Sequence, residues 1–435
     1  DVYFGAATTT PVSTSAGWHT LLVGGLRLGG RGVYALDITD PTAMAAGKVL
    51  WEFNADAPAQ AAWSDGSISN PGGNPANLGY TYGQPNIGRL NNGKWVVLVP
   101  GGYFPDCTKA PFTGANCTSP AAASNTFSSL FVLDAQTGKL IRELKTPAAN
   151  SGGANSHGLS SPVLGDYNDD QVDDVAFAGD LDGNLWRYDL SSSDPNSWAV
   201  TLAFKPATAG AQPITSMPRL FADPVTNKFI VVFGTGKYLG VGDNTSGSAT
   251  TQSVYGIRDN GTTVTRTQLV AQTLSEATAD DGKTIARGLT DNAVDSSKGG
   301  WYFDLGPSTS SAGERVVVTP GALFDTGRAV IQTLIPGTND PCNASIQGAL
   351  MVVNAATGGA NGGLSAPGVS GWNGTGKYVV GGRVNDPRTT GTVPLVTTVG
   401  GGSVLVPGLK LTGSNNVLNI NDAIWRRRSW RQIIR

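Results

Sequence analysis

The sequence predicts an all-β protein, and two observations support this prediction. Apolar residues recur with a period of two in short runs bounded by Gly, Asn, Asp and Pro, and almost no run follows the 3.6-residue period of a helix. The 435 residues include 59 Gly, roughly twice the ordinary share, and glycine disfavours helices while it supplies turns. With 40% hydrophobic and 14% charged residues, the composition excludes a coiled coil, a helical repeat and a disordered chain.

Predicted strands are spread along the whole chain. In order, they cover residues 20–23, 32–37, 49–53, 94–99, 130–134, 140–144, 174–179, 184–189, 229–234, 253–258, 315–318, 329–334, 349–354 and 404–407. Three stretches rich in Gly, Ser, Thr, Asn and Pro are expected to be long surface loops, namely residues 56–83, 104–127 and 277–298.

Several strands belong to a repeated phrase, in which an apolar strand ends in Asp or Asn and a short turn containing Gly leads to a second strand. The phrase is clearest at residues 130–144, with the turn Thr137-Gly138-Lys139, and again at residues 350–358. Hairpins repeated around a ring indicate a β-propeller. At ~40–50 residues per blade the length allows about six to eight blades, and we expect about seven in one domain over residues 1–435. A pair of β-sandwich domains is the alternative.

Charge and hydropathy limit the partners. A formal net charge of -2 gives no broad basic field, which argues against nucleic acid as a partner. No apolar stretch approaches the ~20 residues of a membrane-spanning helix, so we expect no transmembrane segment. The sequence begins at Asp1 without a Met or a signal peptide, as a processed protein or an excised fragment would.

The three cysteines bear on the compartment. Cys107 and Cys117 lie ten positions apart in a turn-rich stretch, a spacing that suits a small disulfide-closed loop in an oxidising compartment; two free thiols are the alternative. Cys342 is left over, either to pair with a cysteine outside this sequence or to stay a free buried thiol.

A carboxylate-rich segment between two predicted strands is the strongest candidate site. Oxygen-bearing side chains lie at positions 1, 3, 5 and 9 of residues 166–174, which is the ligand spacing of an EF-hand-type calcium loop. The expected Ca²⁺ ligands are Asp166, Asn168, Asp170, the main-chain carbonyl of Val172, and Asp174.

This segment departs from the EF-hand pattern at two positions. Phe177 occupies the twelfth position, where an EF-hand has a Glu. We therefore expect either that Asp174 is a bidentate ligand or that a water molecule completes the coordination shell. Gln171 replaces the Gly of the sixth position. Asp169 and Asp173 are expected to face solvent or to bond to the ligands. The alternative is an Asp/Asn-rich turn without metal. Five carboxylates within nine residues repel one another without a cation, which favours calcium.

The sequence offers little for catalysis, and we expect no enzyme. His19 and His157 are the only histidines, so a multi-His metal centre is excluded, and no Gly-Xaa-Ser-Xaa-Gly elbow marks a nucleophile. We expect His157 to be a structural residue, rather than a neighbour of the metal, and Asp182-Gly183 to form an ordinary hairpin turn. The Arg- and Trp-rich residues 425–435 are expected to pack on the body; binding of an anionic partner is the alternative.

Taken together, seven motifs resemble the C-terminal domain of the PilC/PilY family, the type IV pilus tip-associated biogenesis factors and adhesins. In chain order they are LVGGL (22–26), GGRGVYALD (29–37), GDYN (165–168), GDLDGNLWRYD (179–189), FGTGKY (233–238), GWYFDL (300–305) and SWRQ (429–432). Each motif alone is weak, but as an ordered set over almost the whole chain they are specific.

The resemblance implies a modified, quinoprotein-like β-propeller with long loop insertions and a calcium loop whose ligands fall on Asp166, Asn168, Asp170, Val172 and Asp174. It implies a secreted bacterial protein at the pilus tip (fimbrium), the outer-membrane-associated cell surface or the periplasm. Calcium occupancy would regulate pilus extension against retraction, and so twitching motility and surface attachment. Expected partners are minor pilins at the tip and, through a variable N-terminal adhesive region of family members, host-cell or surface receptors.

Two other functions remain open. A quinoprotein-type dehydrogenase would share the propeller and the calcium, but it needs a cofactor-stacking Cys-Cys pair or an equivalent, and no adjacent cysteines occur. A propeller module that binds glycans or proteins is the other. Quinone absorbance would support the first, and glycan-array binding the second.

Overall fold

The computed structural model describes residues 1–5, 15–45, 48–104, 126–240, 243, 250–278, 285–323, 326–337, 347–360 and 377–385, and the short strands at 395–399, 402–406 and 418–420. Within these ranges the chain contains strands and single 3₁₀ turns but no α-helix, so the all-β prediction is confirmed. The 3₁₀ turns are η2 (Pro75–Asn77), η4 (Ala149–Ser151), η5 (Pro195–Ser197), η7 (Arg266–Gln268) and η8 (Thr309–Ser311).

The chain divides into two compact units. The first comprises Asp1–Asp243 with Ile257–Gln268, and the second Asn244–Gly256 with Leu269–Arg435. The boundary between them falls inside strand β18 (Ser253–Arg258). Because compactness alone does not decide which part folds independently, the single domain over residues 1–435 stays a prediction, as does the number of blades.

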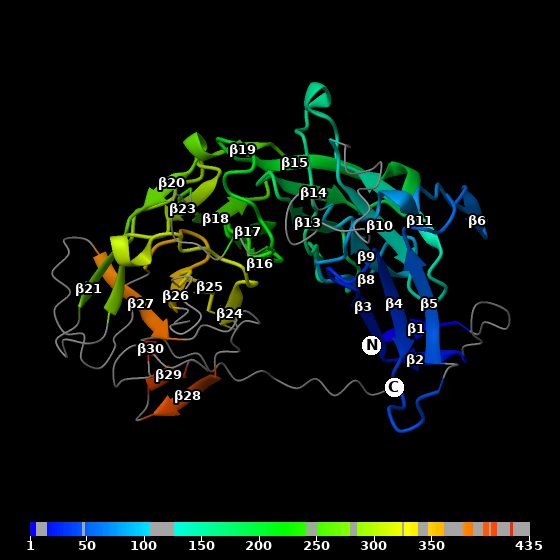
Figure 1. Ribbon diagram of the computed structural model, residues 1–435, viewed down its shortest axis with the longest axis horizontal. Helices are drawn as coiled ribbons and strands as arrows, with labels where there is room; N and C mark the ends of the chain where they lie inside the picture. Colours follow the sequence, from blue (N-terminus) through cyan, green and yellow to red (C-terminus); the bar gives the residue numbers. More distant parts are fainter. Residues whose placement is uncertain are drawn as a thin grey trace. The chain divides into compact units, whose positions relative to one another are not determined.

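The first unit is a series of antiparallel sheets (Figure 1). Its smaller groups are β1 (Val2–Phe4) with β2 (Gly17–His19), β3 (Leu21–Gly25) with β4 (Gly32–Asp37) and β5 (Val49–Asn54), β6 (Trp63–Asp65) with β7 (Ile68–Asn70), and β16 (Arg219–Ala222) with β17 (Phe229–Gly234). A four-stranded sheet has the order β11 (Leu140–Lys145), β10 (Ser129–Asp134), β9 (Trp95–Pro100), β8 (Asn86–Arg89). Another runs β12 (Val163–Gly165), β13 (Val175–Gly179), β14 (Leu185–Asp189), β15 (Ala199–Lys205), with β19 (Val264–Thr265) added in parallel.

The second unit contains a six-stranded sheet of order β21 (Leu274–Thr278), β22 (Ile285–Thr290), β27 (Lys377–Asn385), β26 (Gln347–Asn354), β25 (Arg328–Gln332), β24 (Gly321–Leu323). It also holds a parallel pair of β20 (Val270–Gln272) with β23 (Gly300–Asp304), and the three strands β28 (Leu395–Val399), β29 (Gly402–Val406) and β30 (Leu418–Ile420).

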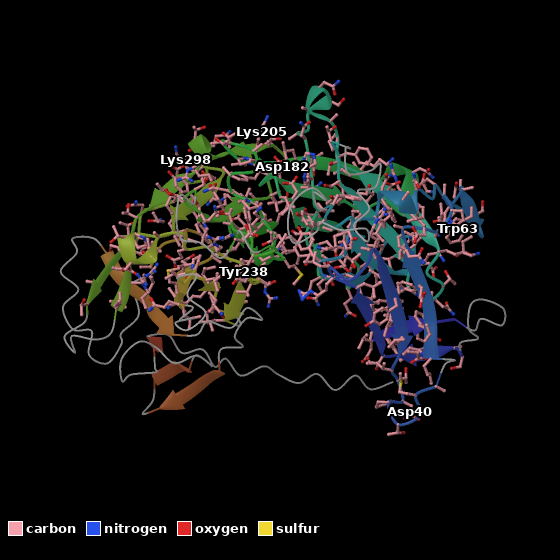
Figure 2. All side chains as sticks on the ribbon, viewed as in Figure 1. Asp40, Trp63, Asp182, Lys205, Tyr238 and Lys298 are labelled. Atoms are coloured by element: carbon pink, nitrogen blue, oxygen red, sulfur yellow. The ribbon has the colours of Figure 1, made fainter. Side chains whose placement is uncertain are left out.

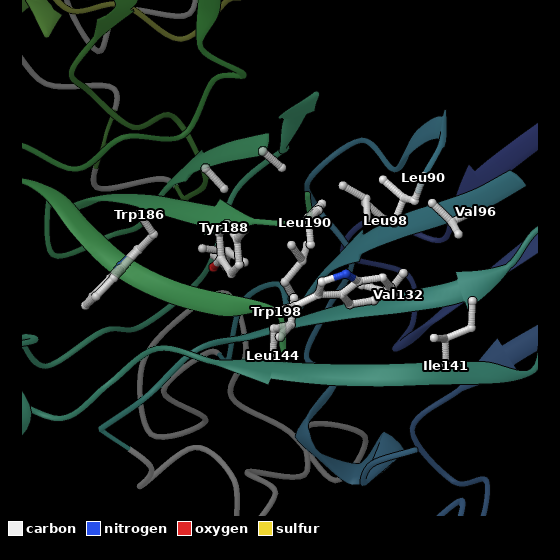
Figure 3. Close-up of a cluster of buried hydrophobic side chains, with 14 of the residues drawn as sticks. Leu90, Val96, Leu98, Val132, Ile141, Leu144, Trp186, Tyr188, Leu190 and Trp198 are labelled. Carbon is white, nitrogen blue, oxygen red and sulfur yellow. The ribbon is translucent and has the colours of Figure 1, made fainter. Parts of the chain in front are cut away.

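The β9–β10 pair shows where the core of the first unit lies. Val96 and Leu98 face one hydrophobic cluster, with side chains from β11, β13 and β14, while Val97 and Val99 face a second, with side chains from β4 and β5. Figure 3 shows side chains of the first cluster, with Trp198 near the centre of the view. Both faces of the sheet are therefore buried, which explains why the strand reads as an unbroken apolar run instead of alternating.

Two tryptophans bond to the same kind of turn. Trp51 Nε1 donates to the carbonyl of Ala135 at 2.8 Å in the first unit, and Trp301 Nε1 donates to that of Ala355 at 2.9 Å in the second. Each turn follows a strand ending in Asp or Asn and closes on a glycine with positive φ, Gly138 or Gly358. At these two places the repeated phrase in the sequence forms a turn whose carbonyl accepts a hydrogen bond from an indole.

Most predicted strands are confirmed within one or two residues, but one predicted strand and two predicted loops are wrong. Residues 315–318 form no strand: Arg315 makes a single bridge to Leu334, and the valines that follow are largely buried without a ladder. The expected loop over residues 277–298 contains β22, and the loop over 56–83 holds the β6–β7 hairpin. Cys107, Cys117, Cys342 and residues 425–435 lie outside the described residues.

Candidate metal loop

The segment Asp166–Asp174 joins two neighbouring strands. Gly165, at the end of β12, pairs with Val175, at the start of β13, so the sheet holds both ends of the loop. Gly165 must be a glycine, because a Cβ there would lie 2.5 Å from the Phe229 ring. The predicted ligands are thus placed on a tight connection with fixed ends.

Main-chain amides of the loop bond to its own side chains. The carboxylate of Asp166 accepts from the N–H groups of Asn168 at 3.0 Å, Asp169 at 2.8 Å and Gln171 at 2.7 Å. In the same way Asn168 Oδ1 accepts from Asp170 N at 3.0 Å, and Asp170 Oδ1 from Val172 N at 2.8 Å. These bonds wind alternate residues into a compact turn.

Gln171 occupies the sixth position of the loop, where an EF-hand has a glycine. Gln171 itself adopts left-handed backbone geometry with φ 69°, and Asp169 does so with φ 60°. Asp169 is exposed, and so are the expected ligands Asn168 and Asp170.

Asp174 closes the loop. Its Oδ2 accepts from Tyr167 N at 3.0 Å and its Oδ1 from Asn91 Nδ2 at 3.3 Å, and only 9% of the residue is exposed. The neighbouring Asp173 is held against β8, since its N–H donates to the carbonyl of Arg89 at 2.7 Å. Burial, reinforced by the charges of Asp166 and Asp174, raises the pKa of Asp173 to about 6.

The five predicted ligands lie on one short turn, but their carboxylates do not converge on one point. Across the described ranges, no three Asp, Glu, His or Cys side chains lie close enough together to hold a metal by themselves. The predicted set also uses the Asn168 amide and the Val172 carbonyl, and such a mixture of hard oxygens fits Ca²⁺ chemically. The calcium site therefore stays a prediction, supported by donor type and spacing.

Tyr167 is a residue of this site that sequence reasoning missed. Its hydroxyl donates to Asp259 Oδ2 and accepts from Arg187 Nη2 at 3.3 Å, and its ring stacks on Phe229. Burial and the neighbouring Asp259 raise the pKa of the tyrosine hydroxyl. No local signal marks this role, because Asp259 lies 92 positions away in the sequence.

His157 is a structural residue, as expected. Its Nδ1 lies 2.6 Å from Oδ2 of Asp182, which is labelled in Figure 2, and this hydrogen bond raises the pKa of the imidazole. Asp182 belongs to the β13–β14 hairpin turn, so the prediction of an ordinary turn is confirmed. Within that turn Asp180 is fully buried and accepts from Ser156, Asn184 and Trp186, and burial raises its pKa to about 6.

The fold and the comparison with known families identify the class of protein to which this chain belongs. Successive small antiparallel sheets, built largely from neighbouring hairpins, are the units from which a β-propeller is made. The family model described as the PilY1 beta-propeller domain matches residues 5–285, and the chain belongs to this family. The prediction of a propeller of the PilC/PilY type is therefore confirmed.

Curated relatives and a solved structure support the same family assignment. The chain is 33% identical over 384 residues to the type IV pilus biogenesis factor PilY1 of Pseudomonas aeruginosa, covering 79% of this chain and 28% of that protein. It is 32% identical over 437 residues to a PilY1 homolog of Xylella fastidiosa, covering 97% of this chain and 30% of the homolog. The crystal structure of the P. aeruginosa PilY1 C-terminal domain matches with a TM-score of 0.67 and 28% identity, covering 91% of this chain and 81% of that one.

The chain spans less than a third of the length of these curated relatives. They are named as biogenesis factors, which agrees with the expectation that the chain is not an enzyme. In the part of the chain that the structure describes, no helix is long and apolar enough to cross a membrane.

Proposed function

We propose that this chain is the calcium-binding propeller domain of a type IV pilus biogenesis factor, and that calcium occupancy regulates pilus extension against retraction. Family membership supports the pilus role. One observation carries the calcium role: oxygen donors alternate along residues 166–174, on a loop whose two ends are paired in one sheet.

The proposal extends to partners and place. The domain acts in a secreted protein at the pilus tip or the adjoining cell surface or periplasm, in contact with minor pilins, and supports twitching motility and attachment. Host-cell or surface receptors are bound through a separate N-terminal adhesive region. Support for these points is the pilus role named for the relatives.

Calcium titration by calorimetry tests the metal role. The wild-type chain should bind one Ca²⁺, and Asp174→Ala should abolish binding while circular dichroism stays unchanged, because the flanking strands remain paired. Asn168→Ala should be milder, since Asp174 is expected to supply the bidentate contact that a twelfth-position Glu gives elsewhere. Unchanged binding in Asp174→Ala would end the ligand assignment.

A cellular experiment tests regulation. The full-length protein carrying Asp174→Ala should reach normal levels but give altered piliation or twitching. Wild-type pilus function in a variant shown to have lost calcium would contradict the regulatory role while leaving the metal site intact.

A further inference from the structure

Tyr167 connects the metal loop to a buried carboxylate outside it. The residue occupies the second position of the loop, and its hydroxyl donates to Asp259 Oδ2. The Asp259 side chain is 1% exposed, and Arg187 Nε lies 3.2 Å from its Oδ1. The main-chain N–H of Asp259 donates to the carbonyl of Phe229 at 2.9 Å, so this carboxylate has a fixed place beside β17.

The tyrosine ring is held as firmly as its hydroxyl. It stacks on Phe229 with ring centroids 5.3 Å apart and an interplanar angle of 24°, and the ammonium of Lys228 lies 5.3 Å from its centroid. Aromatic pairs and cation–π contacts of this geometry are attractive beyond simple burial. The ring and the hydroxyl together define one orientation for this residue.

The same residue also holds a predicted calcium ligand. Its main-chain N–H donates to Asp174 Oδ2 at 3.0 Å, and it directly follows Asp166, the first expected ligand. Any shift of Tyr167 therefore moves the first and last ligands of the loop.

We propose that Tyr167 is a positioning residue of the metal loop, which couples calcium binding to the Asp259 carboxylate and to β17. This inference rests on the proposed calcium site. Coupling between two equilibria is reciprocal. The bond between Tyr167 and Asp259 strengthens calcium binding by a certain factor, and bound calcium strengthens that bond by the same factor. Occupancy of an exposed loop is thus transmitted to a buried group on another sheet.

Calcium affinity measures this coupling. Tyr167→Phe keeps the ring on Phe229 and removes only the hydroxyl, so it should raise the Kd for Ca²⁺ about tenfold, as expected for a lost hydrogen bond to a charged group. Asp259→Asn keeps an acceptor oxygen but removes its charge, so it should raise the Kd by a smaller factor. The double variant should bind calcium no more weakly than Tyr167→Phe alone, because without the tyrosine hydroxyl the residue at position 259 has no such bond to accept. Tyr188→Phe is the matched control: that hydroxyl is buried and has no hydrogen-bond partner among the described residues, so the Kd should not change.

A metal-free measurement separates this inference from the calcium proposal. In EDTA, hydrogen exchange of peptides covering residues 166–174 should be faster in Tyr167→Phe than in the wild type, and unchanged in Tyr188→Phe. If the wild type binds no calcium, the proposed function is wrong, and faster exchange still shows that Tyr167 anchors the loop. If the wild type binds calcium and Tyr167→Phe binds it equally well, or if exchange is unchanged, the positioning role is overturned.

Discussion

The indole of Trp51 donates a hydrogen bond to the carbonyl of Ala135, 84 positions further along the chain. This bond joins β5 to the turn that follows β10, and the indole lies directly over Gly138 at the end of that turn. Trp301 and Ala355 repeat the arrangement in the second unit across 54 positions. The same turn thus connects separate sheets in both units.

Gly138→Ala should destabilise the first unit strongly. An added Cβ would lie 2.6 Å from Cγ of Trp51, and the residue has φ 70°, so steric overlap adds to backbone strain for a loss of about 3 kcal/mol. Gly93→Ala is the matched control, because Gly93 has φ 79° but no atom of the described residues lies within 4 Å of its added Cβ; it should lose only about 1 kcal/mol. Urea unfolding measures both, and equal losses would contradict the docking role of the turn.

Asp170→Asn and Asp169→Asn should differ in calcium binding, although both remove one negative charge from adjacent positions. Both residues are exposed, but only Asp170 lies at a position of the expected ligand spacing. An Asn at position 170 still accepts from the Val172 amide, so the turn is preserved and only the ligand charge is lost. We expect Asp170→Asn to raise the Kd about tenfold or more and Asp169→Asn only a few-fold. Similar effects on calorimetry would show that charge alone attracts the ion.

Asp182→Asn should lower the pKa of His157, which NMR can follow easily because the chain has only two histidines. The hydrogen bond and the charge of Asp182 raise that pKa in the folded chain. The pair therefore stabilises the fold fully below the ordinary histidine pKa of 6.5, and this stability is lost as the pH rises through the raised value. Because the His157 side chain is 47% exposed, the contribution stays below about 1 kcal/mol. An unchanged titration in Asp182→Asn would contradict the assignment.

Glu314→Gln should destabilise the second unit. Arg287 is fully buried, with Nη2 3.0 Å from Glu314 Oε2 and Nε 2.7 Å from Glu276 Oε1, and the equally buried Arg383 shares Glu276. Neutralising Glu314 removes one of the two carboxylates that the described residues place beside the buried Arg287, at a cost of about 3 kcal/mol. Glu52→Gln, on an exposed position of β5, should change stability by less than about 0.5 kcal/mol. Thermal unfolding compares the two, and equal midpoints would show that the cluster is not stabilising.

How much the sequence predicts depends on whether the signal is local. The β10–β11 hairpin was predictable because its strands are apolar, and Asp134 and Gly138 mark the turn between them. The loop at residues 166–174 was predictable for the same reason, since all of its expected ligands lie within one short segment.

Features that depend on distant partners could not be predicted. The sequence of β22, which contains an arginine, was assigned to a polar loop. In the structure Arg287 is buried, and Glu314 neutralises its charge. Conversely, residues 315–318 contain three valines, which are typical of a strand. Val316 and Val318 are buried, but this segment forms no ladder of strand hydrogen bonds beyond the single bridge of Arg315. The anchoring of Tyr167 by Asp259 belongs to the same group, because its partner comes from another sheet.

The pairing of Gly165 with Val175 has a thermodynamic consequence for the metal loop. Closing a flexible loop costs conformational entropy, and here that entropy is lost when the sheet folds, before any ion arrives. The internal amide bonds of Asp166 reduce the remaining freedom further. At the proposed calcium site, a preorganised loop of this kind would lose less conformational entropy on binding than a free peptide of the same sequence, which would offset part of the missing contact from a twelfth-position glutamate.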